Sequence, residues 1–184
     1  MNKEKSLFFI ALLPPESIRA EIERIKSYFA RVYQSSAALK SPAHITLQPP
    51  FEWECHQDNL LTKVLESFAL TREPVSIINS GFGAFKPRVI YIDVIKTKEL
   101  LEIQKDLQLH CKKYLNIANK DSKNRSFKPH LTLAYRDLTK ANFYKAWQEF
   151  EGREYDRTFV ISKLTLLKHN GKRWEIDRDL SFDR

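Results

Sequence analysis

"SPAHITLQPPF" (Ser41–Phe51) and "SFKPHLTLAYR" (Ser126–Arg136) share one pattern, a proline just upstream of His-apolar-Thr-apolar. The alternation of apolar and polar residues predicts a short β-strand in each stretch. Because side chains alternate along a strand, each histidine shares a face with the threonine two positions later. The four polar residues are His44, Thr46, His130 and Thr132. The residues between and after them should point into the core; these are Ile45, Leu47, Leu131 and Leu133.

The repeat of the pattern carries more weight than either copy. The chain has five histidines and eight threonines, so only about 0.02 matched His-x-Thr pairs are expected by chance. Apolar residues at all four flanking positions lower that to below about 0.001. A lone copy would be better explained as a hydrogen-bonded histidine at a strand end, but the matched pair favours a functional site.

The residue types of the repeat suit chemistry on a phosphate. If the two strands face each other, two imidazoles and two hydroxyls converge. Free histidine titrates near pH 6.5, so a neutral and a protonated imidazole can serve as general base and general acid. Threonine hydroxyls can donate hydrogen bonds to phosphate oxygens, and phosphoryl transfer depends mainly on positioning and charge stabilisation. No nucleophilic side chain is required.

Length and composition fit a globular protein with an anionic partner. A chain of 184 residues, 42% of them hydrophobic, suggests one domain or two packed lobes. The formal net charge of +8 favours RNA or phosphates, although solubility is an equally good explanation. The apolar run Leu7–Leu13 ends at Pro14-Pro15 and predicts a buried strand instead of a signal peptide. No run approaches the ~18 residues of a membrane span. We expect a monomeric cytoplasmic protein with no membrane partner.

The sequence offers no metal or cofactor signature. Cys55 and Cys111 fit no metal-binding spacing and are expected to be reduced, half-buried packing residues. No acidic residue lies within either His-x-Thr motif. With only four glycines, the chain lacks a P-loop and a dinucleotide fingerprint. We therefore expect no metal and no cofactor, and ATP-driven ligation is disfavoured.

Hydrophobic periodicity predicts an α+β fold with an internal duplication. Amphipathic helices are expected over 17–33, 60–68, 100–114 and from about Thr139 to 150. Further strands are expected at Leu7–Leu13, Val75–Ile78, Arg88–Val94, Phe159–Leu167 and Arg173–Phe182, with an Asn170-Gly171 hairpin turn before the last. The series strand, helix, His-x-Thr strand, helix, strand runs from Leu7 to about Phe82 and again from Arg88 to Leu167. It predicts two similar lobes sharing a cleft, as one folding unit over residues 1–184.

The paired motifs HITL and HLTL resemble those of the two-histidine phosphoesterase superfamily, most closely its 2'-5' RNA ligase and RNA 2',3'-cyclic phosphodiesterase branch. The similarity covers most of the chain, including the first strand "LFFIALLPP" and the terminal "KLTLLKHNGKRWEI" hairpin. It implies a bilobal α+β fold with two antiparallel sheets around a central cleft. It also implies that His130 is the general base and His44 the general acid. Some members carry an arginine five residues after the second histidine, where this chain has Tyr135 followed by Arg136.

Basic and aromatic residues near the motifs are candidates for substrate binding. The candidates are Phe51, Tyr135, Arg136, Lys86, Arg88 and Lys128. Aromatic residues here, with Trp53 and Phe85, could stack on a nucleobase, although packing is the commoner role. The loop Asn119–Lys128 is either a solvated loop or a phosphate clamp. The other histidines, His56, His110 and His169, lack a partner motif and are expected to be structural or exposed.

These features predict a metal-independent enzyme that opens 2',3'-cyclic phosphates at RNA ends or on nucleotides. If a 5'-hydroxyl replaced water, the same site would join RNA, as the resemblance implies. One alternative is an RNA-end binding module in which the histidine pair holds phosphate without turnover. A purely structural repeat is a weaker alternative.

Overall fold

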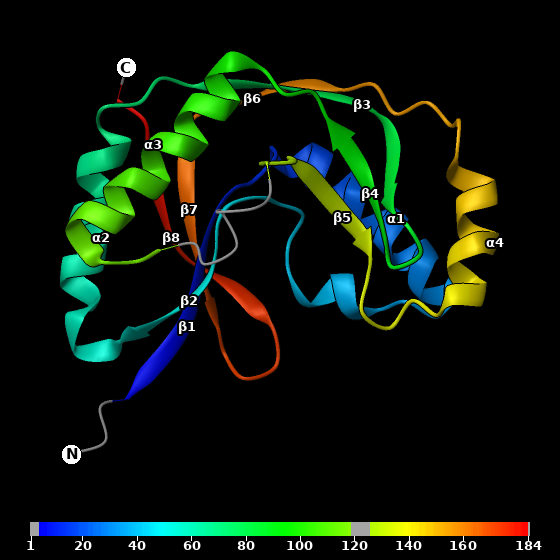
Figure 1. Cartoon of the computed structure of the whole chain (residues 1–184), viewed down its shortest axis with the longest axis horizontal. Helices are drawn as coiled ribbons and strands as arrows, with labels where there is room; N and C mark the ends of the chain where they lie inside the picture. The colour runs from blue at the N-terminus through cyan, green and yellow to red at the C-terminus, as the bar shows by residue number, and fades with distance from the viewer. Residues whose placement is uncertain (1–3, 119–125, 184) are drawn as a thin grey trace.

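The computed structural model describes residues 4–118 and 126–183, which form two four-stranded antiparallel sheets with helices packed on them (Figure 1). The first sheet has the order β2-β1-β7-β8, with β1 Lys5–Leu12, β2 Ile45–Glu54, β7 Lys163–His169 and β8 Trp174–Ser181. The second has the order β5-β4-β3-β6, with β3 Val75–Phe85, β4 Val89–Val94, β5 His130–Ala134 and β6 Thr158–Ile161. The helices are α1 Glu16–Tyr33, α2 Asp58–Ala69, α3 Lys98–Leu115 and α4 Lys140–Phe150, with short 3-10 helices η1 Ala37–Lys40 and η2 Cys55–Gln57. The predicted α+β class is confirmed.

Each sheet is built from both halves of the chain. The two predicted series are present, but the last strand of each series is part of the sheet that contains the other series' His-x-Thr strand. Strand β3, which follows the first His-x-Thr strand, pairs with β4. Strand β7, which follows the second, pairs with β1. The duplication pattern suggested that the two lobes are consecutive halves of the sequence. The strand pairing shows instead that each lobe contains a strand from the other half.

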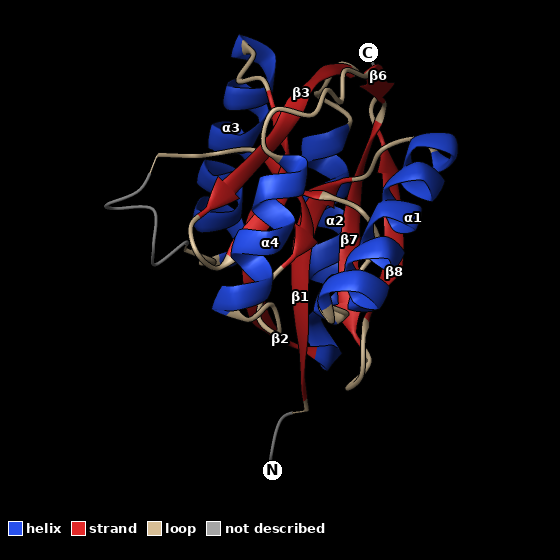
Figure 2. Ribbon diagram, turned by 90° about the vertical axis from the view of Figure 1, so that its right-hand side faces the viewer, coloured by secondary structure: helices blue, strands red, loops and turns tan. Residues whose placement is uncertain are grey.

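The helices are exchanged in the same way. Helices α2 and α3 lie on the first sheet, where α3 contacts β2 and α2 contacts β8. Helices α1 and α4 pack together on the second sheet, where α1 contacts β5 and α4 contacts β4 (Figure 1). Figure 2 shows β1 running through the middle of the molecule, with α3 on one side and α1 on the other. Because α1 connects β1 to β2 yet packs on the opposite sheet, it ties the two lobes together.

The His-x-Thr strands alternate as their sequence predicts. Ile45 and Leu47 on β2 are at most 1% exposed, and Leu131 and Leu133 on β5 are fully buried. The polar residues between them are half-buried. Burying these large aliphatic side chains contributes roughly 1.5–3 kcal/mol each. The core therefore fixes the register of both strands, and a slip of one residue would turn the polar face into the core.

Two strand predictions need correction. The expected strand Phe159–Leu167 is broken at Ser162 into β6 and β7, which belong to different sheets. The expected strand Val75–Ile78 extends to Phe85, although it contains Gly81 and Gly83. Glycines weaken the strand signal, but they also mark close approaches of neighbouring groups. Here a Cβ on Gly83 would lie 2.3 Å from the ring of Tyr91, its partner on β4.

The two cysteines are free thiols, as expected. Cys55 is half-buried, and its Sγ lies 3.3 Å from the Ser6 hydroxyl. Cys111, expected to be half-buried, is instead fully buried in α3. Burial raises the pKa of its thiol to about 12, which favours the neutral thiol and fits a packing residue.

Candidate active site

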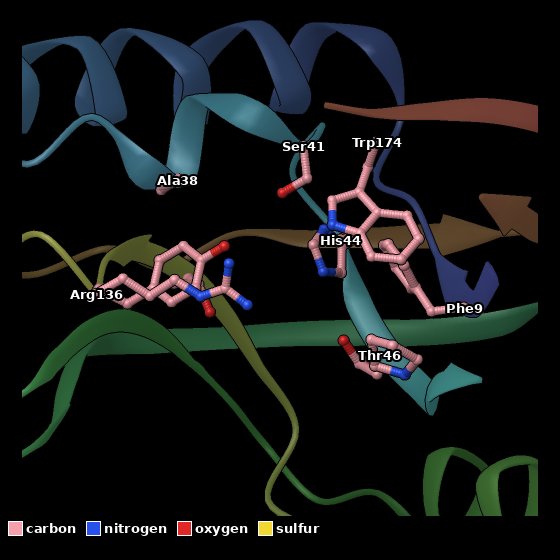
Figure 3. Close-up of a pocket in the computed structure, with 10 residues that line it drawn as sticks. Phe9, Ala38, Ser41, His44, Thr46, Arg136 and Trp174 are labelled. Carbon is pink, nitrogen blue, oxygen red and sulfur yellow. The ribbon is translucent and has the colours of Figure 1, made fainter. Parts of the chain in front are cut away.

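A pocket of about 200 Å³ opens where β2, β5 and the β7–β8 hairpin approach one another (Figure 3). It is lined by Phe9, Ala38, Ser41, His44, Thr46, Pro50, Thr132, Tyr135, Arg136 and Trp174. Residues from both His-x-Thr motifs thus meet in one cavity. Five predicted site residues are among the lining set: His44, Thr46, Thr132, Tyr135 and Arg136.

The polar ends of several lining side chains point toward a common space. In Figure 3 the Thr46 hydroxyl, the Ser41 hydroxyl and the Arg136 guanidinium all turn toward the space beside the His44 ring. The Trp174 indole and Phe9 lie against the other side of that ring. Two hydroxyls and a guanidinium are all hydrogen-bond donors, so the cavity suits an anion. The aromatic wall is apolar and excludes water from one side of the imidazole.

Each motif histidine makes the same kind of hydrogen bond, from its Nδ1 to the backbone carbonyl two residues earlier. The Nδ1 of His44 lies 2.7 Å from the carbonyl oxygen of Pro42, and the Nδ1 of His130 lies 2.7 Å from that of Lys128. A carbonyl only accepts, so each Nδ1 carries a proton. This leaves each Nε2 free either to accept a proton as a base or to donate one as an acid.

His130 does not line the pocket, but it is electrostatically coupled to it. It begins β5, two residues before Thr132, so the two share a face of the strand. Its positive charge is one of the influences that lower the pKa of His44. The second imidazole is therefore near enough for its charge to act on His44, although burial is the main cause of the lowered His44 pKa.

Aromatic rings pack against both imidazoles. Phe9 on β1 lies 4.7 Å from the His44 ring, centroid to centroid, and Tyr91 on β4 lies 5.0 Å from the His130 ring. Phe85 meets the His130 ring edge-on at 5.3 Å. Tyr91 lies over Gly83, so the missing Cβ of that glycine leaves room for the ring that supports His130.

The surroundings of the two histidines disfavour their charged forms to different degrees. Burial lowers the pKa of His44 to about 4; Lys26 and His130 act in the same direction, and the Pro42 hydrogen bond acts against it. Burial also lowers the pKa of His130, where the Lys128 hydrogen bond and Asp93 oppose the shift and the Lys128 charge adds to it. In the free protein, His44 is therefore the more weakly basic of the pair.

Arg136 reaches the pocket through an unusual backbone conformation. Its φ is +59°, in the left-handed region that few non-glycine residues adopt. The next residue, Asp137, anchors this turn to the start of η1. Its carboxylate accepts hydrogen bonds from the Ser35 hydroxyl, the Ser36 amide and hydroxyl, and the Ala37 amide. The guanidinium also lies over the Tyr135 ring, 5.2 Å from its centroid.

The other predicted substrate residues lie outside the pocket. Phe51 stacks on Phe8 and packs against the core, and Lys86 pairs with Glu151 at 3.5 Å. Arg88 is exposed in the turn between β3 and β4. Lys128 lies over Phe85 and Tyr91, the two rings that contact His130. These four residues remain candidates for longer substrates, not for the pocket itself.

The remaining sequence candidates have mixed outcomes. Trp53 is buried, and its indole N–H donates to the Gln57 carbonyl, which fits the packing role. His56 is exposed, whereas His110 packs on Phe68 and Tyr114. His169 meets Trp174 edge-on and so supports a pocket residue. Most of the polar loop 119–128, including Lys120, Lys123 and Arg125, falls outside the described residues.

Sequence reasoning missed half of the cavity wall. The missed residues are Phe9, Ala38, Ser41, Pro50 and Trp174. Ser41 and Pro50 lie within the first quoted stretch, and their closeness to His44 and Thr46 was an available signal. Phe9 and Trp174 come from strands distant in sequence and carry no local signal of a site.

Within residues 4–118 and 126–183, no group of three or more His, Cys, Asp or Glu side chains is arranged to hold a metal ion. Over the same residues, no helix is long and apolar enough to cross a membrane.

Comparison with known proteins finds the same fold and a matching family. Residues 14–173 match the model of the 2'-5' RNA ligase superfamily. A Staphylococcus epidermidis protein, provisionally named a phosphoesterase, is 27% identical over 171 residues, which cover 91% of this chain and 94% of that protein. E. coli LigT, solved in complex with 3'-AMP, has a TM-score of 0.70 at 16% identity, covering 98% of this chain and 100% of LigT. TT0787 of Thermus thermophilus has a TM-score of 0.66 at 17% identity, covering 96% of this chain and 98% of TT0787. At these identities the structural similarity establishes the fold.

Proposed function

Because this chain belongs to the 2'-5' RNA ligase superfamily, we propose that it is a phosphodiesterase that opens 2',3'-cyclic phosphates on RNA ends or nucleotides. The observation that carries the proposal is the meeting of both His-x-Thr motifs at one pocket, with each histidine Nδ1 bound to a carbonyl. That arrangement provides one proton acceptor and one proton donor beside a set of anion-binding groups. A 3'-AMP complex of LigT, a structural neighbour, further supports a nucleotide ligand.

The reaction needs two proton transfers and one in-line displacement. Water attacks phosphorus, and the Nε2 of one neutral histidine takes its proton. The bond from phosphorus to one ribose oxygen breaks, and the Nε2 of the other, protonated histidine supplies a proton to that oxygen. Thr46, Thr132 and Arg136 donate hydrogen bonds to the phosphate oxygens as negative charge builds up. If an RNA 5'-hydroxyl takes the place of water, the same steps form a phosphodiester bond.

A binding module without turnover is the second candidate, because the same donors would also hold a terminal phosphate. An oligonucleotide ending in a 2',3'-cyclic phosphate, incubated with the pure protein, separates the possibilities. Conversion to a phosphomonoester end supports the enzyme, and saturable binding without conversion supports the module. If the protein neither converts nor binds the oligonucleotide, both the enzyme and the binding module are ruled out.

The charges around the two histidines favour a definite division of roles. The family resemblance gives His130 the base role and His44 the acid role. The charges of the free protein favour the reverse for hydrolysis, because His44 is the more weakly basic residue and stays neutral over more of the pH range. His130, with Asp93 beside it, keeps its proton to higher pH. Environments that push two pKa values apart commonly mark the acid and the base.

This division predicts a bell-shaped dependence of kcat/KM on pH. Activity rises with pH as His44 loses its proton, with an apparent pKa of about 4, and falls as His130 loses its proton. Because burial lowers both values, the optimum should lie below pH 6.5. Initial rates at low substrate concentration across pH 3.5–9 measure the profile of the free enzyme. An optimum above pH 7 would contradict this arrangement of charges.

Activity should persist after metal removal. No step of the proposed mechanism uses a metal, because the proton acceptor, the proton donor and the anion-binding groups are all side chains. We expect the rate in excess EDTA to match the untreated rate, measured with the same cyclic-phosphate oligonucleotide. Loss of turnover that a divalent ion restores would show that the reaction depends on a metal.

Replacing either motif threonine with alanine should lower kcat less than replacing either motif histidine does. Thr46→Ala or Thr132→Ala removes one neutral donor from a site that retains Arg136 and the other threonine. We expect kcat to fall by about 10- to 10²-fold, somewhat less than the usual loss for one oxyanion donor. Serine variants keep the hydroxyl and should recover most of the rate. If the alanine variants were fully active, the threonines would have no part in binding the phosphate.

A further inference from the structure

One buried lysine lies behind the first motif. Lys26, in the middle of α1, is 1% exposed, although lysine is rarely so deeply buried without a partner. Its Nζ donates to Glu23 Oε1 at 2.8 Å and to the backbone carbonyl of Ser41 at 2.9 Å. The second contact is the important one, because Ser41 lines the pocket and begins the stretch that leads to His44.

Glu23 holds the other end of the same stretch. Its Oε1 accepts a hydrogen bond from the Ala43 amide at 3.0 Å while also accepting from Lys26. Two side chains of one helix therefore grip residues 41–43 at a carbonyl and at an amide. Pro42 lies between these two points, and its carbonyl accepts the proton of His44 Nδ1. The carbonyl that sets the His44 tautomer thus lies in a tripeptide, residues 41–43, that is fixed at both ends by Lys26 and Glu23. We call these two side chains the clamp.

The clamp also places a positive charge near the imidazole. The charged and titratable groups around His44 are Lys26 and Glu23 from α1, His130 from β5, and Tyr135 and Arg136 after β5. Of these, Lys26 and His130 lower the pKa of His44. Lys26 is buried whereas Glu23 is half-exposed, and the ion pair offsets only part of the free-energy cost of removing the lysine charge from water. Stability alone is therefore a weak explanation for Lys26, whereas holding a catalytic residue is a direct one.

We propose that Glu23 and Lys26 are positioning residues for His44, which hold residues 41–43 so that the Pro42 carbonyl fixes the tautomer and direction of the imidazole. The catalytic part of this inference rests on the proposed function, whereas the tautomer of His44 can be measured without any substrate.

The first test replaces the lysine with an apolar residue of similar length. Lys26→Met should lower kcat by about 10- to 10²-fold with little change in KM, because a small misplacement of a catalytic group has effects of that size. Lys98→Met is the matched control, since Lys98 is an exposed helix lysine paired with Glu102. It should leave kcat unchanged. Circular dichroism and urea unfolding check that each variant is folded.

The second test reads the imidazole directly. Long-range ¹H–¹⁵N NMR spectra of the free protein report the tautomer and pKa of His44. In the wild type we expect a proton on Nδ1 at neutral pH. In Lys26→Met we expect a mixture of tautomers and an upward shift of the pKa, because a nearby positive charge is lost. These signals remain informative even if no cyclic phosphate is turned over, so failure of the clamp and failure of the proposed function are distinguishable.

Glu23 provides a second pair of variants in case Lys26→Met does not fold. Glu23→Gln retains an acceptor oxygen for the Ala43 amide, whereas Glu23→Ala removes it. We expect Glu23→Ala to lose about 10-fold in kcat and to disturb the His44 tautomer, and Glu23→Gln to recover much of both. Folded Lys26→Met and Glu23→Ala proteins with wild-type His44 tautomer, pKa and kcat would overturn the proposal and leave the pair a purely structural role.

Discussion

Replacing either His44 or His130 with alanine is expected to reduce turnover of a cyclic-phosphate oligonucleotide by about 10²–10⁴-fold. Each imidazole carries a separate proton transfer, and each is fixed by its own Nδ1 bond to a carbonyl. The double variant should be little worse than either single variant, because residues that act as a unit are strongly non-additive. Rates of phosphomonoester formation, measured by chromatography, compare the three variants with the wild type.

The control for the histidine variants is a histidine that contacts neither motif. His110 lies between α2 and α3, where its Nε2 is 3.0 Å from the Val64 carbonyl. His110→Ala should cost some stability but leave kcat within about 3-fold of the wild type, because it touches no reacting group. Full activity in folded His44→Ala or His130→Ala protein would rule out the proposed mechanism.

Replacing Arg136 with methionine is expected to lower kcat/KM by about 10²- to 10³-fold. Among the described residues that line the pocket, Arg136 carries the permanent positive charge, and losing one donor that stabilises a developing oxyanion has effects of this size. Methionine preserves much of the side-chain length and apolar contact while removing the charge. Kinetics with the cyclic-phosphate oligonucleotide measure the loss, and Arg136→Lys, which keeps a point charge but not the fork of donors, should recover only part of it.

Arg178→Met is the matched control for Arg136. Arg178 is exposed on the edge strand β8, so this variant loses the same charge away from the pocket. We expect it to keep wild-type kcat/KM at moderate ionic strength, where charges beyond about 10 Å are screened. Equal losses in both variants would mean that Arg136 acts only through net charge.

Local patterns predicted most of the elements and the central residues of the pocket. The helical periodicity was enough for all four helices, and the Thr139 start of the last is confirmed by its side-chain cap on the Asn142 amide. The matched motif pointed to His44, Thr46 and Thr132 because strand alternation is a short-range property. Tyr135 and Arg136 followed from their closeness to the second motif. Their roles in catalysis and binding remain predictions.

What the sequence could not predict depends on long-range pairing. The run Phe159–Leu167 has strand-forming residues on both sides of the polar pair Ser162-Lys163, and so short an interruption does not show that the two sides belong to different sheets. The same holds for Trp174, which reaches the pocket only because β8 joins the sheet of β1 through β7. Lys26 illustrates a third limit. It lies four residues after Ile22 on the apolar face of α1, and only the packed structure shows that this face meets residues 41–43.

The exchange of strands between the sheets has a consequence for how the chain acquires its active form during synthesis. Strand β1 begins at Lys5 and pairs with β7, which begins at Lys163, so β1 is synthesised well before its neighbour in the sheet. Such distant pairings slow folding, because a long loop must close before its contacts form. The first sheet stays incomplete until then, with an unpaired edge that a chaperone or another nascent chain can bind. The pocket, whose lining includes Trp174 of β8, should therefore form late in folding, and a chain that ends before β7 should show no activity.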